Sequence, residues 1–182
     1  LVADAVAQGA RLVVLPEYFP IIGAIDADRV RAGEQFGDGP IQAWLAETAR
    51  RHDIWLFAGS IPLAASTPDK MRNSSLVFNP AGECVKRYDK VHLFGFSKGD
   101  ESYDEASFIE PGDQLAAVDT PFGRVALSIC YDLRFPELYR ALAPVDLDRL
   151  LRETVETWVA RALERRVVGQ PQPVAPRPAP QE

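Results

Sequence analysis

The sequence predicts one α/β domain in which buried strands alternate with helices, followed by a further helix and a proline-rich tail. Three observations support this fold class. Short apolar runs such as RLVVLPE, bounded by Gly and Pro, are typical of buried strands. Segments with apolar residues at helical spacing lie between these runs. Alternation of the two along a chain of 182 residues favours helices layered on a sheet in a single domain.

The N-terminal segment predicts a helix, a strand and a long loop. Residues 1–8 carry apolar side chains at helical spacing, and Gly9 is a suitable helix end. RLVVLPE then predicts a fully buried strand, which brings Glu17 to the strand's carboxyl end. Residues 18–39 show no clear periodicity, so we expect an irregular loop there.

The central segment predicts a helix followed by three strands. PIQAWLAETARRH (residues 40–52) begins with proline, shows one apolar face and ends in basic residues, as helices do. IWLFAGSI (residues 54–61) is expected to form one buried strand. Residues 72–94 predict a hairpin of two strands, because the turn NPAGE supplies both Pro and Gly.

The last part of the domain is expected to contain a polar loop, two strands and a short helix. The loop spans residues 97–112, and the runs QLAAVDT and RVALSIC are joined by PFG. The second run is expected to remain a strand as far as Cys130, where YDLRFPELYR forms a turn and a short helix. Cys130 therefore lies at a strand-to-helix junction.

The character of the chain changes after Ala143. Residues 144–168 place apolar side chains on one stripe and predict an amphipathic helix. Residues 169–182 are rich in proline and polar side chains, and they predict a disordered or polyproline-like tail. We therefore divide the chain into a domain at 1–143, a helix at 144–168 and a tail at 169–182.

Composition excludes several classes of function. The hydrophobic content of 47% is ordinary for a globular protein, and the net charge of −6, without a basic patch, argues against nucleic acid. Because no apolar stretch can span a bilayer and no signal peptide begins the chain, we expect no membrane partner and a cytoplasmic location. The two cysteines, Cys84 and Cys130, form neither a disulfide framework nor a metal-ligand pattern.

Three polar side chains stand where apolar strands end: Glu17, Lys90 and Cys130. Sites in α/β sheets form at the carboxyl ends of strands, so the three are candidates for one catalytic set. A carboxylate can accept a thiol proton, and an ammonium can stabilise an oxyanion together with the backbone N–H of Tyr131. The start of a helix at Cys130 is expected to lower the pKa of its thiol.

Other interpretations of the same residues stay open at this point. Taken singly, Glu17 fits a strand-end carboxylate, Lys90 a solvated lysine and Cys130 a buried apolar cysteine. A Cys130–His92 pair is a rival catalytic arrangement, because His92 and Lys90 project to the same face of an extended segment. His52, at a predicted helix end, is a less suitable partner.

The strings around the three residues resemble the motifs of the nitrilase superfamily, the carbon–nitrogen hydrolases. LPEYF, RYDKVHLF and ICYDLRFPELYR occur in the family's order, and the resemblance covers about residues 1–143. It implies an αββα sandwich, here incomplete, that usually assembles into homo-oligomers. It also implies hydrolysis of amides or nitriles through a thioester, without metal or organic cofactor.

The resemblance also implies a role for each residue. Glu17 is expected to be the general base, Lys90 the oxyanion stabiliser and Cys130 the nucleophile. YDEASFIEPGD places Glu105 where many members carry a second, supporting glutamate. YDLRFPEL after the cysteine favours the amidase branch, which acts on small linear ω-amides or deaminated peptide amides.

The sequence also departs from the family pattern. The family's first strand is not visible before Leu1, and its later strands and pocket segments are not visible after Ala143. The chain is therefore expected to be truncated at both ends. This leaves a non-enzymatic alternative, in which an inactive relic of the fold acts through oligomerisation or partner binding.

Overall fold

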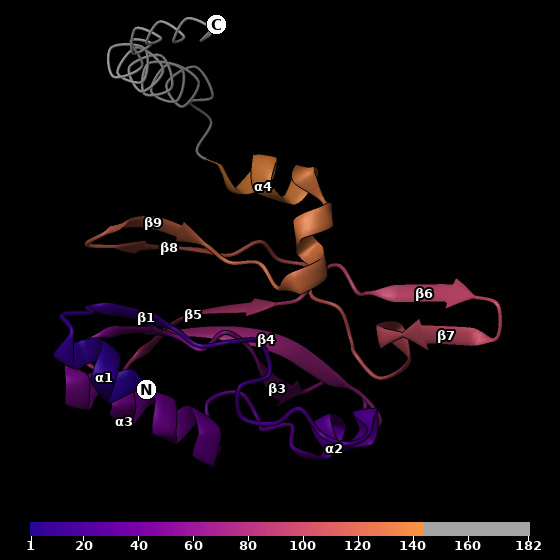
Figure 1. The fold of residues 1–182 in the computed structure, drawn as a ribbon, viewed down its shortest axis with the longest axis horizontal. Coiled ribbons are helices and arrows are strands. Elements are labelled where there is room, and N and C mark those ends of the chain that lie inside the picture. The colour runs from indigo at the N-terminus through magenta and orange to yellow at the C-terminus, as the bar shows by residue number, and fades with distance from the viewer. Residues whose placement is uncertain (144–182) are drawn as a thin grey trace, which may run out of the picture. The chain divides into compact units, whose positions relative to one another are not determined.

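The computed structural model of the chain describes residues 1–143, and its centre is a five-stranded sheet (Figure 1). The long strand β4 pairs antiparallel with β2 and β3 along one edge and with β5 along the other. The edge strand β1 pairs parallel with β2. The strands are β1 (Leu12–Val14), β2 (Trp55–Phe57), β3 (Ile61–Ala64), β4 (Met71–Phe78) and β5 (Cys84–Asp89).

Helices cover one face of this sheet. Figure 1 shows α1 (Val2–Ala7) and α3 (Pro40–His52) together on that side. The α3 prediction is confirmed, with Pro40 in its first turn and Leu45 and Ala49 fully buried against the sheet. The core between helix and sheet is apolar and includes Leu45, Ala49, Ile54, Leu56, Ala58, Ile61, Leu63, Leu76 and Phe78.

A second sheet covers the opposite face. The hairpin of β8 (Ala117–Thr120) and β9 (Gly123–Ala126) lies above the main sheet in Figure 1. Its flanking residues Leu127 and Ile129 pack with Phe57, Val77 and Tyr88 of the main sheet. Helix α4 (Pro136–Leu142) follows, so the order of layers in the described residues is helix, sheet, sheet and helix. This is the expected αββα class with a second sheet of two strands.

Two segments expected to be irregular contain regular structure. The predicted loop 18–39 includes the short helix α2 (Asp26–Arg31). The predicted loop 97–112 overlaps a hairpin of β6 (Gly95–Lys98) and β7 (Glu101–Asp104), followed by a 3₁₀ turn at Glu105–Ser107. Because most residues of this hairpin face solvent, its strands carry no apolar alternation, and composition alone indicated a loop.

The predicted strand at residues 54–61 is divided in two by Gly59. The φ angle of Gly59 is +59°, and a Cβ at this position would lie 2.1 Å from the carbonyl oxygen of Leu15. The chain therefore bends here, β2 ends at Phe57, and β3 begins at Ile61. The bend lets the segment that leads to Glu17 pass directly over the backbone of Gly59.

Two further expectations about strands were wrong in detail. The first strand is not fully buried, because Val14 is 65% exposed at the edge of the sheet. The strand leading to Cys130 ends at Ala126, so residues 127–129 leave the hairpin before the cysteine. The helix expected at 144–168 and the tail expected at 169–182 lie outside the described residues.

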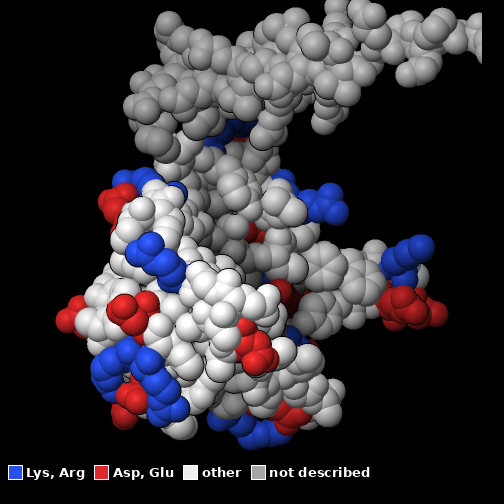
Figure 2. All heavy atoms as spheres, turned by 60° about the vertical axis from the view of Figure 1, so that its left-hand side comes forward, with Lys and Arg blue, Asp and Glu red and all other residues white. Residues whose placement is uncertain are grey.

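The surface of the described part carries both signs of charge. Figure 2 shows Lys and Arg side chains interspersed with Asp and Glu on the visible face, separated by uncharged areas. Many are paired within one helix, such as Arg50 with Glu47 in α3. Within residues 1–143, no helix has the length and apolar character that a membrane crossing requires.

Candidate active site

Glu17 is held at the end of β1 by a strained turn. The next residue, Tyr18, has a φ of +52°, and its backbone N–H donates to Ser60 Oγ at 3.1 Å. Because Gly59 has no side chain, the backbone of Leu15 and Pro16, just before Glu17, packs directly against it. The Glu17 side chain is 34% exposed and accepts a hydrogen bond from Asn73 Nδ2 at 2.9 Å. The hydrogen bond fixes the orientation of the carboxylate, which remains partly exposed to solvent.

Lys90 is completely buried beside two carboxylates, which excludes the solvated interpretation. Its Nζ donates to Glu105 Oε1 and Oε2 at 3.0 and 2.8 Å and lies 3.9 Å from Glu17 Oε1. Burial of a charge is costly unless it is paired and hydrogen-bonded. Glu105, which is also buried, supplies that pairing, and its Oε2 accepts from the N–H of Phe94 at 2.7 Å.

Cys130 begins the 3₁₀ turn Cys130–Arg134 and has a φ of +49°, an uncommon conformation for a residue with a side chain. Strain of this kind concentrates at functional sites, where surrounding structure enforces it. Cys130 itself is exposed. Tyr131 follows within the first turn, where a backbone N–H has no acceptor inside the helix.

The environment of Cys130 raises the pKa of its thiol rather than lowering it as expected. Burial of the sulfur is the largest cause, followed by the negative charge of Glu17, while the positive charge of Lys90 acts in the opposite direction. A hydrogen bond with the Glu17 carboxylate also raises this pKa. The helix-start argument failed because burial of the sulfur and the negative charge of Glu17 outweigh the effects that lower the pKa of the thiol. A protonated thiol therefore lies beside the Glu17 carboxylate.

A cavity of about 300 Å³ joins these two groups. Glu17 and Cys130 both line it. Its other walls come from β1, the β2–β3 bend, β4 and residues 126–129, namely Val14, Leu15, Phe57, Gly59, Ser75, Ala126, Leu127, Ser128 and Ile129. The walls are mainly apolar, which suits a small ligand held by a few polar groups.

Asp132 fixes the turn that carries Cys130, and the sequence analysis missed it. This fully buried carboxylate accepts from Tyr88 Oη at 2.6 Å and from the N–H of Ile129 at 2.9 Å. It also accepts from the N–H of His92 at 2.9 Å. One side chain thereby ties the turn that begins at Cys130 to β5 and to the segment after Lys90. The only signal in the sequence was an acidic residue two positions after the cysteine.

His92 bonds to Asp132 and helps to hold the turn at Cys130, rather than forming a pair with Cys130. Its Nδ1 lies 2.8 Å from Asp132 Oδ1, and its ring stacks on Phe135 with centroids 3.6 Å apart. The geometry therefore disfavours the rival Cys130–His92 arrangement. Lys90 contacts both Glu17 and Glu105, and Cys130 lies beside Glu17 in the same cavity.

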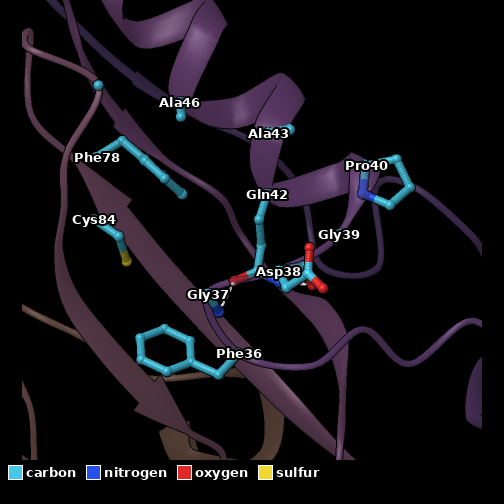
Figure 3. A pocket seen from close by; sticks show the side chains of 11 residues that line it. Phe36, Gly37, Asp38, Gly39, Pro40, Gln42, Ala43, Ala46, Phe78 and Cys84 are labelled. Atoms are coloured by element: carbon cyan, nitrogen blue, oxygen red, sulfur yellow. Dashed lines mark hydrogen bonds between the residues drawn. The ribbon is translucent and has the colours of Figure 1, made fainter.

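A second and larger cavity, of about 490 Å³, holds the other cysteine (Figure 3). Cys84 and Phe36 face the same hollow, and Gln42 extends from α3 toward Gly37. The polar groups of Gln42 are already used, because it accepts from Gly37 N at 2.8 Å and donates to Glu34 Oε2 at 3.0 Å. Burial raises the pKa of Cys84, and its thiol donates to the backbone carbonyl oxygen of Lys86 at 3.7 Å rather than to a carboxylate.

The described residues offer no site for a metal ion. Residues 1–143 contain no group of three or more His, Cys, Asp and Glu side chains arranged to hold one. The carboxylates nearest to Cys130 are instead engaged with Lys90 and Asn73.

Comparison with known proteins matches most of the chain. The family model for carbon-nitrogen hydrolases matches residues 1–170. A deaminated glutathione amidase from Yersinia enterocolitica is 41% identical over 138 residues, covering 74% of this chain and 48% of that protein. The human omega-amidase NIT2 is 35% identical over 152 residues, covering 78% of this chain and 50% of the relative. The chain thus spans about half the length of these relatives.

Solved structures give the same result. The Caenorhabditis elegans NitFhit protein has a TM-score of 0.67 and 34% identity, covering 76% of this chain and 34% of that one. A glutamate-to-glutamine mutant of an amidase from Nesterenkonia sp. AN1, with acrylamide added at its active site cysteine, has a TM-score of 0.64 and 26% identity. That match covers 77% of this chain and 52% of the amidase.

Proposed function

Because the chain belongs to the carbon–nitrogen hydrolase family, we propose that it hydrolyses a small linear amide to a carboxylate and ammonia through a thioester on Cys130. Amidases of small molecules are among its relatives, including an omega-amidase and a deaminated glutathione amidase. The roles proposed for Glu17, Lys90, Glu105 and the Tyr131 N–H are supported by the contacts of Lys90 with both glutamates and by the effect of Glu17 on the Cys130 thiol.

Acylation begins with proton transfer from Cys130 Sγ to the Glu17 carboxylate, because the thiol's raised pKa keeps it protonated at rest. The sulfur attacks the amide carbon, and the negative charge that develops on the amide oxygen is stabilised by Lys90 Nζ and the N–H of Tyr131. Glu17 then returns its proton to the leaving nitrogen. The carbon–nitrogen bond breaks, ammonia departs, and a thioester remains.

Hydrolysis of the thioester reverses the roles. Glu17, again a carboxylate, removes a proton from water as the water oxygen attacks the thioester carbon. The same two donors stabilise the second oxyanion. The carbon–sulfur bond breaks, the sulfur regains the proton from Glu17, and the carboxylic acid product leaves.

Glu105 supports this chemistry electrostatically. A buried charge is costly unless it is paired and hydrogen-bonded. Both Glu105 oxygens lie within 3.0 Å of Lys90 Nζ, which pairs the ammonium and fixes its position near Glu17. We assign Glu105 to pairing and positioning Lys90 rather than to contact with the substrate.

The single observation that carries the proposal is the contact of a buried, charged lysine with two carboxylates, one of which shares a cavity with Cys130. We further propose that the substrate is a small amide met in the cytoplasm, and that the enzyme works as a homo-oligomer.

An inactive relic that acts through association is the second candidate. The exposure of Val14 at the sheet edge and of Leu133 in the nucleophile turn favours it, because such apolar surface promotes association. Both residues lie in a chain that spans about half of its relatives' length.

Ammonia release from a panel of small amides separates the two candidates. If the chain is an amidase, the release of ammonia should be lost in Cys130→Ala and retained in Cys84→Ala, because Cys84 lines the other cavity. A folded chain that releases no ammonia from any amide, and whose sedimentation shows assembly, would support the relic instead.

A further inference from the structure

Asn73 lies against the proposed base and is fully buried in the middle of β4. Its Nδ2 donates to Glu17 Oε1 at 2.9 Å, across 56 positions of sequence. Its backbone carbonyl oxygen accepts a hydrogen bond from the backbone N–H of Lys90 at 2.9 Å. One residue therefore touches both partners of the proposed nucleophile.

The two oxygens of Glu17 differ in their surroundings. Oε1 receives the hydrogen bond from Asn73 and faces Lys90 Nζ at 3.9 Å. Neither Asn73 nor Lys90 bonds to Oε2. A proton avoids an oxygen that already faces an N–H donor and a positive charge, so Oε2 is the more basic oxygen.

The orientation of the Asn73 amide is coupled to the charge of Glu17. Asn73 Oδ1 is buried and accepts no hydrogen bond within the described residues. Reversing the amide would place Oδ1 against the Glu17 carboxylate and bring two acceptors together. The carboxylate therefore holds Nδ2 toward itself, and Nδ2 in turn holds Glu17 Oε1 in place.

We propose that Asn73 is a positioning residue that fixes the orientation of the Glu17 carboxylate and directs the proton from Cys130 to Glu17 Oε2. This inference rests on the proposed function, because it gives a role to the base assigned there. Its chemistry is that of an amide donor on one carboxylate oxygen, which leaves the other free for proton transfer.

The test is the pH dependence of iodoacetamide alkylation at Cys130 in the full chain, followed by peptide mass spectrometry. The sulfur displaces iodide, and Glu17 takes the thiol proton, so the acid limb of the rate follows protonation of Glu17. Cys84 in the same molecule serves as the internal reference, because it lines a different cavity.

Asn73→Ala removes the donor, and the acid limb is expected to move to higher pH by about one unit, since hydrogen bonds to charged groups are among the stronger ones. Asn73→Asp retains the shape and adds a second negative charge, so its shift is expected to be larger. A matched control is Ser74→Ala on the same strand, which removes a bond to Asp89 and is expected to leave the limb in place.

Each failure has a separate signature. Unshifted limbs in folded Asn73→Ala and Asn73→Asp proteins would overturn the inference, and so would an equal shift at Cys84. Glu17→Gln tests the proposed function itself, because it is expected to remove the limb that follows Glu17 and to leave only a limb that follows ionisation of the Cys130 thiol. A limb unchanged by Glu17→Gln would overturn the base assignment, whereas a limb lost there but unmoved in both Asn73 variants would overturn only the role of Asn73.

Discussion

Two hydrogen bonds join Asp132 and His92. The Asp132 carboxylate accepts one from the backbone N–H of His92 at 2.9 Å and one from its ring Nδ1 at 2.8 Å. The same carboxylate holds the N–H of Ile129, immediately before Cys130. The segment after Lys90 and the turn at Cys130 are therefore fastened to one buried side chain. Two elements of the proposed site keep their relative positions through it.

Removing this carboxylate is expected to destabilise the fold strongly. Asp132→Ala leaves Tyr88 Oη and two backbone N–H groups without their acceptor, and we expect a loss of about 3–5 kcal/mol in the free energy of unfolding. Urea denaturation followed by fluorescence measures it. The exposed Asp119→Ala is the matched control, and a loss below about 1 kcal/mol for Asp132→Ala would contradict the role we assign.

Lys90 is expected to matter more to turnover than His92. Lys90→Met preserves much of the side chain's volume but removes the oxyanion donor, so the rate of ammonia release should fall by about 10²- to 10³-fold. His92→Asn should retain a rate within about tenfold of the parent, because the ring lies on Asp132 and Phe135. The reverse order of effects would favour the Cys130–His92 pair.

The titration of Cys130 should reveal the charge of Glu17. Burial and the Glu17 carboxylate raise the thiol's pKa above its ordinary value of 9.0, so less than half of Cys130 should be thiolate at pH 9.0. Glu17→Gln removes the negative charge and should lower this pKa, which increases the thiolate fraction at the same pH. Ultraviolet absorbance of the thiolate, measured as the difference from Cys130→Ala, gives both values. A thiolate fraction that falls in Glu17→Gln would contradict the electrostatic account.

Gly59 is expected to be irreplaceable by alanine. Its φ is +59°, and an added Cβ would lie 2.1 Å from Leu15 O and 2.2 Å from Pro16 O. Gly59→Ala should therefore lower the free energy of unfolding by about 3 kcal/mol or more and displace Glu17. Gly9→Ala is the control, because Gly9 also has a positive φ, +92°, but nothing lies within 4 Å of its Cβ position. Equal effects of the two substitutions would show that backbone strain alone, rather than the close approach, matters at Gly59.

Helix α3 and the β4–β5 hairpin were predicted correctly from the sequence, because their side chains pack into the core. They have the apolar spacing and turn residues that burial requires. The β6–β7 hairpin was missed, because solvent-facing strands impose no such pattern. The exposure of Val14 also lay beyond sequence reasoning, since strand composition does not say whether a neighbour covers it.

The site was predictable only as a set of residues. The motifs named Glu17, Lys90 and Glu105, and the structure brings these three together. Asn73 and Asp132 were missed, because their importance comes from hydrogen bonds to residues 56 and 40 to 44 positions away. The predicted direction of the Cys130 pKa shift was wrong for the same reason, since the shift depends first on burial of the sulfur and then on Glu17, a carboxylate distant in sequence.

The most direct test of the central claim is the site of acylation. The chain is incubated with a small amide, quenched in acid and digested, and the acyl group is located by peptide mass spectrometry. We predict a hydroxylamine-sensitive acyl group on Cys130, formed together with one equivalent of ammonia and lost in Glu17→Gln. Acylation of Cys84 instead, or release of ammonia by a Cys130→Ala protein, would contradict the assignment of Cys130 as the nucleophile.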